Sequence, residues 1–337
     1  MRISNTFITA ILACLIVMSF PMTDSSMIDT PAEQYDAIQD VNQANTDLSG
    51  IRVALYESYY SSLDSRVEES RTALYNMLSW MNATVEIINR TDIELGALWA
   101  FEVFVIPEGL GPNIESNLGT DGLEAIRAWV KAGGSYIGVR GSSSIAVTDG
   151  NFEGRHESFR LGLINGTSVG MPDLGYIVVT PLEINQECTG PDLSTMPSQL
   201  NVLFRTGRYF EPDPGQEVIC IANYSYNNKP AMIASNYGEG NVFISSPQFE
   251  YEENNDLDGT TYMDRYSDED SEWPLIMNII QWQVDSSPTV MNTTTWGLTT
   301  TTNATVIEPL TFPTELVLTG TAIGICLIAL VIFFKRR

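Results

Sequence analysis

The stretch that decides the fold is Gly133-Gly134-Ser135-Tyr136-Ile137-Gly138-Val139-Arg140-Gly141-Ser142-Ser143-Ser144. Residues 135–139 are mainly apolar and predict a short buried strand, and the small residues that follow predict a tight turn into a helix. This is the setting of a nucleophile elbow, in which small neighbours allow one side chain to occupy a strained turn at the carboxyl edge of a sheet. Arg140 stands where that side chain would be.

Strands and helices alternate around this stretch. Residues 51–56, 84–88 and 103–106 are short apolar runs that predict strands, while a capping box at 65–68 and an apolar face within 123–132 predict helices. The alternation predicts an α/β fold with a mainly parallel sheet and helices on both faces. The second half is richer in strands, which we expect at 177–180, 218–223, 231–235 and 242–245, before a last amphipathic helix at about 271–283.

The N-terminus combines a basic residue, Arg2, with a mostly apolar run at residues 8–20 and with Pro21 directly after it. This pattern predicts a secretory signal peptide over residues 1–23, because the run is short for a membrane-spanning helix. A retained N-terminal anchor is the competing interpretation, since no clear small-residue cleavage site follows. Residues 24–50 are rich in Asp, Gln and Asn, so we expect a leader without a definite element.

The C-terminus predicts a membrane anchor. Residues 316–334 carry no charge and are long enough to cross a bilayer as a helix, and three basic residues, 335–337, follow at once. The anchor, at 315–337, would therefore keep its basic tail in the cytoplasm and hold the folded domain, at 51–285, outside the cell membrane. The Thr-, Asn- and Pro-rich segment 286–314 has the composition of an extended stalk between the two.

The whole chain is acidic, with 42 Asp and Glu against 17 Lys and Arg and a formal net charge of −25. A surface of this charge repels polyanions, so the composition argues against nucleic-acid binding. We expect no cofactor and no metal. Residues 254–259 begin like a calcium-binding loop, but Arg265 occupies the twelfth position, where such a loop has a bidentate glutamate.

Two cysteines, Cys188 and Cys220, lie in the part of the chain that we expect to be exported. Outside the cytoplasm they could form one disulfide, and two small buried side chains with free thiols are the competing interpretation. An exported chain would also carry N-linked glycans if its host attaches them, which makes it a candidate glycoprotein. Acceptor sequons begin at Asn82, Asn89, Asn165, Asn223, Asn292 and Asn303.

Six stretches, spread in order over nearly all of residues 51–285, carry a resemblance to a known family. They are WMNATV at 80–85, VIPEG at 105–109, the elbow, LGLINGTSVG at 161–170, KPAMIA at 229–234 and VFISSPQFE at 242–250. On these motifs the sequence resembles the biotin-protein-ligase N-terminal-domain family, a branch of the class I glutamine amidotransferase-like superfamily. The resemblance implies a flavodoxin-like α/β sheet.

The same resemblance implies that the catalytic residues of the superfamily are missing. The superfamily has a cysteine at the elbow, which here is Arg140. A late strand leads into a His-x-Glu unit, in which Gln248 replaces the histidine and only Glu250 remains. A guanidinium and a carboxamide cannot act as the thiolate and the base of such a site, so the family reaction is excluded. The loop that usually holds two glycines reads Glu108-Gly109. We therefore expect a pseudoenzyme.

The residues around the former pocket are candidates for ligand contact or for internal pairing. We expect the charge of Arg140 to be balanced by Glu250 or by Glu57, which follows the first strand and so lies at the same edge of the sheet. Such pairing would make the site structural, whereas a small carboxylate- or phosphate-bearing ligand is the expected occupant if those carboxylates point away. The full set of pocket candidates is Glu57, Glu108, Gly109, Arg140, Gly141, Ser142, Gln248 and Glu250.

Three classes of function remain. The first, which we favour, is a catalytically inactive binding or interaction module on the cell surface, held in the membrane by its C-terminal helix and facing a small anionic ligand or a protein partner. The second is an amidase or esterase that uses Ser142, Ser143 or Ser144 with the only histidine of the chain, His156. The third is a structural ectodomain that makes contacts in the cell envelope.

Overall fold

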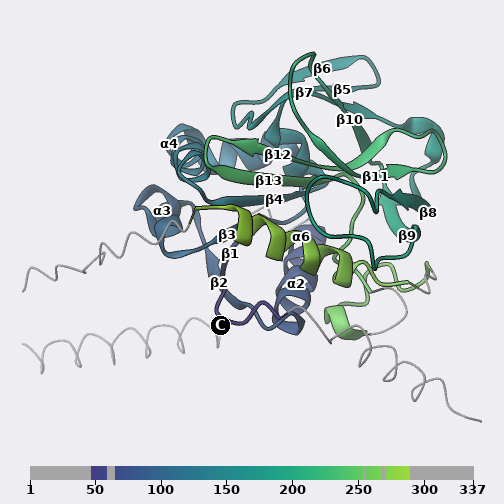
Figure 1. Ribbon diagram of the computed structural model, residues 1–337. Helices are drawn as coiled ribbons and strands as arrows, with labels where there is room; N and C mark the ends of the chain where they lie inside the picture. Colours follow the sequence, from purple (N-terminus) through teal and green to yellow (C-terminus); the bar gives the residue numbers. More distant parts are fainter. Residues whose placement is uncertain (1–46, 59–64, 253–255, 267–269, 289–337) are drawn as a thin grey trace, which may run out of the picture. The chain divides into compact units, whose positions relative to one another are not determined.

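Five parallel strands form the first part of the main sheet in the computed structural model (Figure 1), which describes residues 47–58, 65–252, 256–266 and 270–288. Their spatial order is the 2-1-3-4-5 order of flavodoxin-like sheets. In that order they are β2 (Thr84–Ile88), β1 (Arg52–Tyr56), β3 (Val103–Ile106), β4 (Ser135–Val139) and β13 (Gly240–Ser245). The sequence predicted a strand within one or two residues of each of these positions.

Antiparallel strands extend the same sheet beyond β13. They are, in spatial order, β12 (Pro230–Tyr237), β11 (Ile219–Tyr224), β8 (Ile177–Ile184) and β9 (Gln199–Arg205). The sheet is therefore mixed, and the prediction of a mainly parallel sheet is correct only for its first five strands. Only Gly238 and Glu239 separate β12 from β13, and a connection this short allows neighbouring strands to pair only in the antiparallel sense.

A second, smaller sheet has no counterpart in the sequence prediction. Its strands are, in spatial order, β10 (Arg208–Pro212), β7 (Ile164–Gly170), β5 (Val147–Phe152) and β6 (Arg155–Ser158). Figure 1 shows it at the top of the molecule, above the main sheet. Only two residues, Thr206 and Gly207, separate β9 of the main sheet from β10 of this one, so a single short turn links the two sheets.

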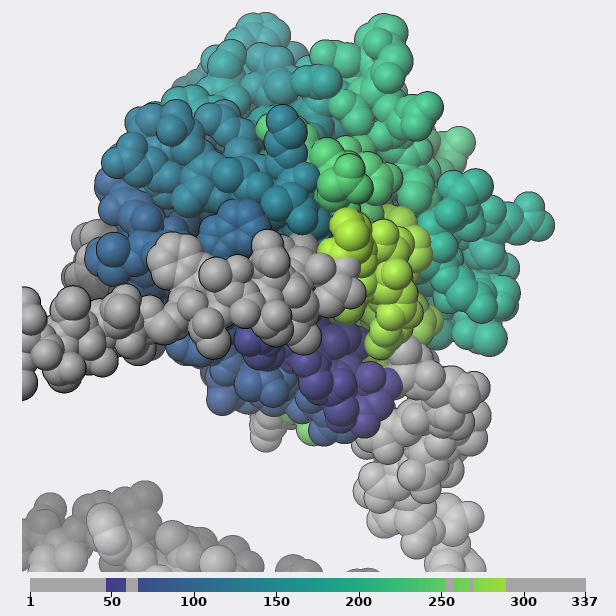
Figure 2. Space-filling model, turned by 60° about the vertical axis from the view of Figure 1, so that its left-hand side comes forward, coloured from purple at the N-terminus to yellow at the C-terminus, as the bar shows by residue number. Residues whose placement is uncertain are grey.

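Helices cover both faces of the main sheet, as predicted. On one face, α2 (Ser65–Trp80) and α6 (Trp273–Ser286) lie side by side, with the rings of Trp80 and Trp273 edge to face at 5.5 Å between centroids. Figure 2 shows the outer side of α6, in yellow-green, at the surface. On the other face, α4 (Gly111–Lys131) buries Trp129 against the strands.

The remaining short elements connect these layers. They are α3 (Arg90–Glu94), η1 (Ala97–Ala100), α5 (Gly141–Ala146), η2 (Pro172–Leu174) and η3 (Asp256–Asp258). Before β1, Leu48 is fully buried and its backbone N–H donates to the carbonyl of Met81, so the end of the expected leader packs into the core.

The predicted signal peptide and membrane anchor lie outside the described residues, as does the predicted stalk beyond residue 288. The first residue of that stalk, Ser286, instead ends α6, so the folded domain extends one residue beyond its predicted end at 285. Of the helices that the structure does describe, none combines the length and the apolar character that a membrane crossing requires.

Candidate functional site

Arg140 occupies a strained turn between β4 and α5, as the elbow prediction requires. Its backbone has φ 54° and ψ −106°, a conformation that is uncommon outside glycine, and its N–H donates to the carbonyl of Ser245 on β13. The neighbouring position must be glycine, because a Cβ added to Gly141 would lie 1.7 Å from the carbonyl oxygen of Gly109. The elbow and the loop after β3 are therefore in direct backbone contact.

The guanidinium of Arg140 is held by three groups from two places in the chain. Nε donates to the carbonyl of Arg205 at 2.9 Å, Nη2 donates to Oγ1 of Thr206 at 2.6 Å, and Nη1 lies 3.8 Å from Oε2 of Glu108. Only 15% of the side chain is exposed. Arg140 therefore places at the elbow a cation that already has protein partners.

Glu108 is the carboxylate that balances this charge, and the predicted partners Glu57 and Glu250 are wrong. Glu57 is exposed and forms no ion pair with Arg140, and Glu250 hydrogen bonds with Ser70 instead. The reason lies in the strand order. Glu108 follows β3, which is the direct neighbour of β4 and its elbow, whereas Glu57 follows β1, one strand further away.

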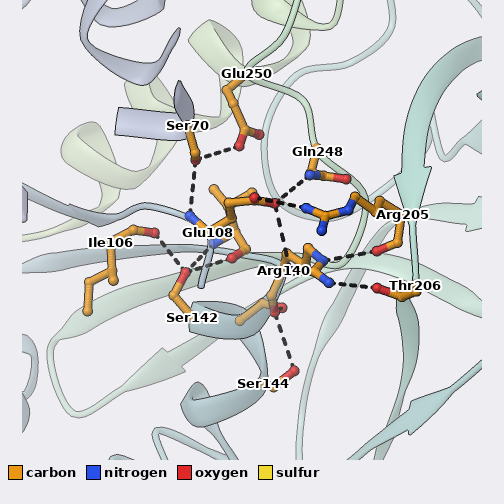
Figure 3. Close-up of polar contacts among 12 residues, drawn as sticks. Ser70, Ile106, Glu108, Arg140, Ser142, Ser144, Arg205, Thr206, Gln248 and Glu250 are labelled. Carbon is orange, nitrogen blue, oxygen red and sulfur yellow. Dashed lines mark hydrogen bonds and ion pairs between the residues drawn. The ribbon is translucent and has the colours of Figure 1, made fainter. Parts of the chain in front are cut away.

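Glu108 also binds two residues from the antiparallel half of the protein. Its Oε1 lies 3.3 Å from Nη1 of Arg205, and its Oε2 accepts a hydrogen bond from Nε2 of Gln248 (Figure 3). The side chains of Glu108 and Arg205 are 1% and 4% exposed. Burial raises the pKa of the Glu108 carboxyl, and the charges of Arg140 and Arg205 oppose that rise.

Glu250 is a second buried carboxyl in the same cluster. Oγ of Ser70, on α2, donates to its Oε1 at 2.7 Å and accepts the backbone N–H of Glu108 at 3.0 Å. Burial and then the nearby charge of Glu108 raise the pKa of Glu250 to about 8. This shift favours the protonated form of Glu250 at neutral pH.

The three residues that the resemblance aligns with a catalytic triad, Arg140, Gln248 and Glu250, belong to one contact network and share no direct hydrogen bond or ion pair within the described structure. Arg140 and Gln248 meet through Glu108, and Glu250 joins through Ser70 (Figure 3). Two buried atoms of this network, Oε1 of Gln248 and Oε2 of Glu250, have no hydrogen-bond partner in the described part of the chain. The network is consequently polar and largely buried, and its hydrogen bonding is incomplete at these two atoms.

The serines after the elbow are structural. Oγ of Ser142 accepts from the N–H of Val139 at 2.6 Å and lies 2.7 Å from the carbonyl of Ile106, and Oγ of both Ser143 and Ser144 donates to the carbonyl of Arg140. His156 is exposed on β6, in the other sheet. No serine–histidine pair forms among the described residues, so the serine-hydrolase hypothesis has no activated nucleophile.

Arg205 and Ser70 are the site residues that the sequence did not reveal. Arg205 ends β9, a strand that was not predicted, and Ser70 is one of several polar residues on α2. Neither lies in a recognisable motif. The available signal for Arg205 was indirect, because buried charges at an elbow need partners of opposite charge, and this requirement does not say which residue supplies them.

Cys188 and Cys220 are both free in the structure. Sγ of Cys188 lies 3.4 Å from the carbonyl of Pro191, and Sγ of Cys220 lies 3.1 Å from Oδ1 of Asn223. The structure therefore has no disulfide between them and agrees with the alternative of two free thiols.

Within the described residues there is no cluster of three or more His, Cys, Asp or Glu side chains that could hold a metal ion. In the calcium-like stretch, the carboxylate of Asp258 accepts the backbone N–H groups of Glu252 and Thr260, and residues 254 and 255 lie outside the described part. Asp258 thus stabilises a turn.

Comparison with known proteins gives similarity in fold only. No family model and no curated protein matches the chain. Among solved structures, a ThuA-like protein from Bacteroides uniformis is 11% identical with a TM-score of 0.48, over 73% of this chain and 96% of that one. A glutamine amidotransferase is 14% identical with a TM-score of 0.44, over 59% and 90%. The glutaminase domain of Trypanosoma brucei CTPS is 13% identical with a TM-score of 0.42, over 60% and 87%.

Proposed function

We propose that this chain is a membrane-anchored, extracytoplasmic pseudoenzyme of the glutamine amidotransferase-like fold that acts as a binding or interaction module. The observation that carries the proposal is the state of Arg140. The elbow retains the strained geometry that presents a nucleophile, but the side chain it presents is a cation bound to Glu108, Arg205 and Thr206.

The chemistry of the site supports the absence of acyl transfer. Such a reaction needs a nucleophile with a base that removes its proton. A guanidinium stays protonated at all physiological pH values and is no nucleophile, and the amide of Gln248 cannot accept a proton as histidine does. Glu250 remains, but it hydrogen bonds with Ser70 and has no histidine to orient.

The finer family assignment and the membrane location rest on the sequence. The motifs of the biotin-protein-ligase N-terminal-domain family support the first, and the uncharged segment 316–334 with its basic tail supports the second. Protease digestion of intact cells tests the location. Residues 51–285 should be cleaved from outside while the basic tail stays protected, and a domain protected in intact cells but cleaved after lysis would contradict an outward orientation.

Turnover assays test the loss of catalysis. The purified full-length protein should show no amidase, esterase or peptidase activity above a protein-free blank, and neither should a Ser142→Ala, Ser143→Ala, Ser144→Ala triple variant, which removes the serine hydroxyls of α5. Turnover that disappears in this variant would instead establish a serine hydrolase, and turnover that survives it would point to another nucleophile. Either result would overturn the pseudoenzyme proposal.

A further inference from the structure

A second positively charged side chain lies beside the elbow and has no carboxylate partner. Arg208, the first residue of β10, is half-buried, and its Nη1 donates to Oγ of Ser168 on β7 at 3.2 Å. No carboxylate of the described chain lies within ion-pairing distance of it. Glu157, on β6, acts on Arg208 only at longer range. Burial lowers the pKa of Arg208, because its charge is partly removed from water. The guanidinium carbon lies 5.4 Å from the centroid of the Phe152 ring, so an aromatic face stands beside the charge in place of a carboxylate.

The end of β13 holds Arg140 and Arg208 close to one another. The N–H of Arg140 donates to the carbonyl of Ser245, and the N–H of Arg208 donates to Oγ of the next residue, Ser246. The charge of Arg140 also contributes to the lowered pKa of Arg208. Beside Arg208, a Cβ at position 150 would approach Nη1 to 3.0 Å, so Gly150 leaves room for the guanidinium.

Two hydroxyl groups at these arginines accept hydrogen bonds but donate none within the described structure. Oγ1 of Thr206 accepts from Nη2 of Arg140, and Oγ of Ser168 accepts from Nη1 of Arg208. Each hydroxyl therefore keeps a proton that it can donate. The four side chains, of Arg140, Ser168, Thr206 and Arg208, form a donor cluster that is short of acceptors.

The backbone at this cluster is strained. Thr206 has φ 43° and its hydrogen-bond partner Arg140 has φ 54°, and a positive φ is an outlier for a β-branched residue. Strain of this kind costs free energy and persists where the surrounding structure enforces it, which is most often at binding and catalytic sites. Two strained residues that bind each other through their side chains mark the cluster as a built feature of the fold.

We propose that the donor cluster of Arg140, Ser168, Thr206 and Arg208 binds a small oxyanion, the carboxylate or phosphate group of a soluble ligand. The inference rests on the proposed function, since it names the ligand class of a binding module built on the same elbow. An oxyanion supplies the acceptors that the cluster lacks, and two guanidinium groups are the residues best suited to hold it. The ion pair of Arg140 with Glu108 stays intact, because Glu108 lies at Nη1 of Arg140 and the oxyanion takes the Nη2 side, where Thr206 lies.

Thermal unfolding of the full-length protein in inorganic phosphate or in acetate, each replacing chloride at constant ionic strength and neutral pH, tests the proposal. One of the two anions should raise the Tm in a saturable manner, and the one that does so distinguishes a phosphate from a carboxylate ligand. Arg208→Gln should weaken the apparent affinity by about tenfold, the loss expected for one charge-assisted contact. Ser168→Ala should weaken it by a smaller factor and does not disturb the charge.

Arg155→Gln is the matched control, because Arg155 is an exposed arginine of the same small sheet and its removal changes the net charge equally. It should leave the affinity unchanged. If Arg208→Gln fails to fold, the anion response of the Ser168→Ala variant alone tests the proposal. A wild-type Tm that responds to neither anion, or an equal response in wild type and Ser168→Ala, would overturn the oxyanion site. Neither result would restore catalysis, so the pseudoenzyme proposal is tested separately by turnover.

Discussion

The parallel and antiparallel halves of the main sheet contribute to the site in different ways. The parallel half builds the frame, because the ends of β3 and β4 place Glu108 and Arg140 next to each other. The antiparallel half supplies what fills the frame: Arg205 and Thr206 come from the end of β9, and Gln248 is joined to β9 by a hydrogen bond to the carbonyl of Leu203. The side chains that meet at the elbow thus come from parts of the chain that are far apart in sequence.

The frame itself is the place where the largest effect is expected. Gly141→Ala should destabilise the protein by more than about 4 kcal/mol, because the new Cβ would overlap the carbonyl of Gly109. Gly122→Ala, in α4, meets only ordinary contacts and should stabilise by up to about 1 kcal/mol. Denaturant unfolding measures both. A folded Gly141→Ala variant of normal stability would mean that the two loops are not in backbone contact.

The second-largest effect on stability is expected at the ion pairs of Glu108, which join the two halves. Arg205→Met should cost about 3 kcal/mol, since it removes the nearer guanidinium from the buried carboxylate of Glu108 and leaves the more distant one of Arg140. Arg140→Met should cost less, about 1 kcal/mol, because Arg205 remains at the shorter distance. Arg52→Met, which breaks the more exposed pair with Glu102, is the reference for a surface ion pair. If Arg140→Met cost more stability than Arg205→Met, the main ion pair of Glu108 would lie within the parallel half, and Arg205 would not be needed to balance its charge.

The pH dependence of stability probes the buried carboxyl at the junction. The pKa of Glu250 is raised from 4.5 to about 8, so the folded state keeps a proton that the unfolded state releases. The resulting stability is fully present below pH 4.5 and is lost as the pH rises to about 8, at roughly 1 kcal/mol per pH unit. In Glu250→Gln this loss should vanish, so the free energy of unfolding of the variant should increase relative to that of wild type as the pH rises.

Glu57→Gln controls for the change of one carboxyl to an amide at the same edge of the sheet, since Glu57 is exposed. Its stability difference from wild type should not change over the same pH range. A parallel pH profile for wild type and Glu250→Gln would show that Glu250 is ionised throughout.

The smallest effect is expected in the antiparallel half. Cys188 and Cys220 should both react with a thiol label after denaturation without reductant, because neither is bonded. Cys220→Ser should then change the stability by less than about 1 kcal/mol. An unlabelled pair would mean that this half carries a covalent link and is more rigid than its hydrogen bonds indicate.

The sequence predicted the parallel half well because its signals are local. Each of its strands is a short apolar run, and the elbow is defined by consecutive small residues around Arg140. The small sheet gave no such signal. β5, for example, reads Val-Thr-Asp-Gly-Asn-Phe, and only two of its six residues are buried, so neither apolar character nor clear alternation marks it as a strand.

The candidate site was predicted in position but not in its pairing. Arg140, Glu108, Gln248 and Glu250 do meet, as the motifs implied. The partner of Arg140 was wrong because the choice among three glutamates depends on which strands are neighbours and on where α2 places Ser70. Contacts between residues that are far apart in the chain decide such a choice, and no short pattern encodes them.

The end of α6 determines how the fold would bear mechanical load. Nδ2 of Asn241, on β13, donates to the carbonyl of Gln283 at 3.0 Å and to Oγ of Ser287 at 2.9 Å, and Nε2 of Gln283 donates to the carbonyl of Tyr136 on β4 at 3.3 Å. Any tension that the chain beyond Pro288 transmits therefore enters through a clamp on two central strands. Force applied there is shared by strands with neighbours on both sides, whereas the same pull on an edge strand would peel it away one hydrogen bond at a time.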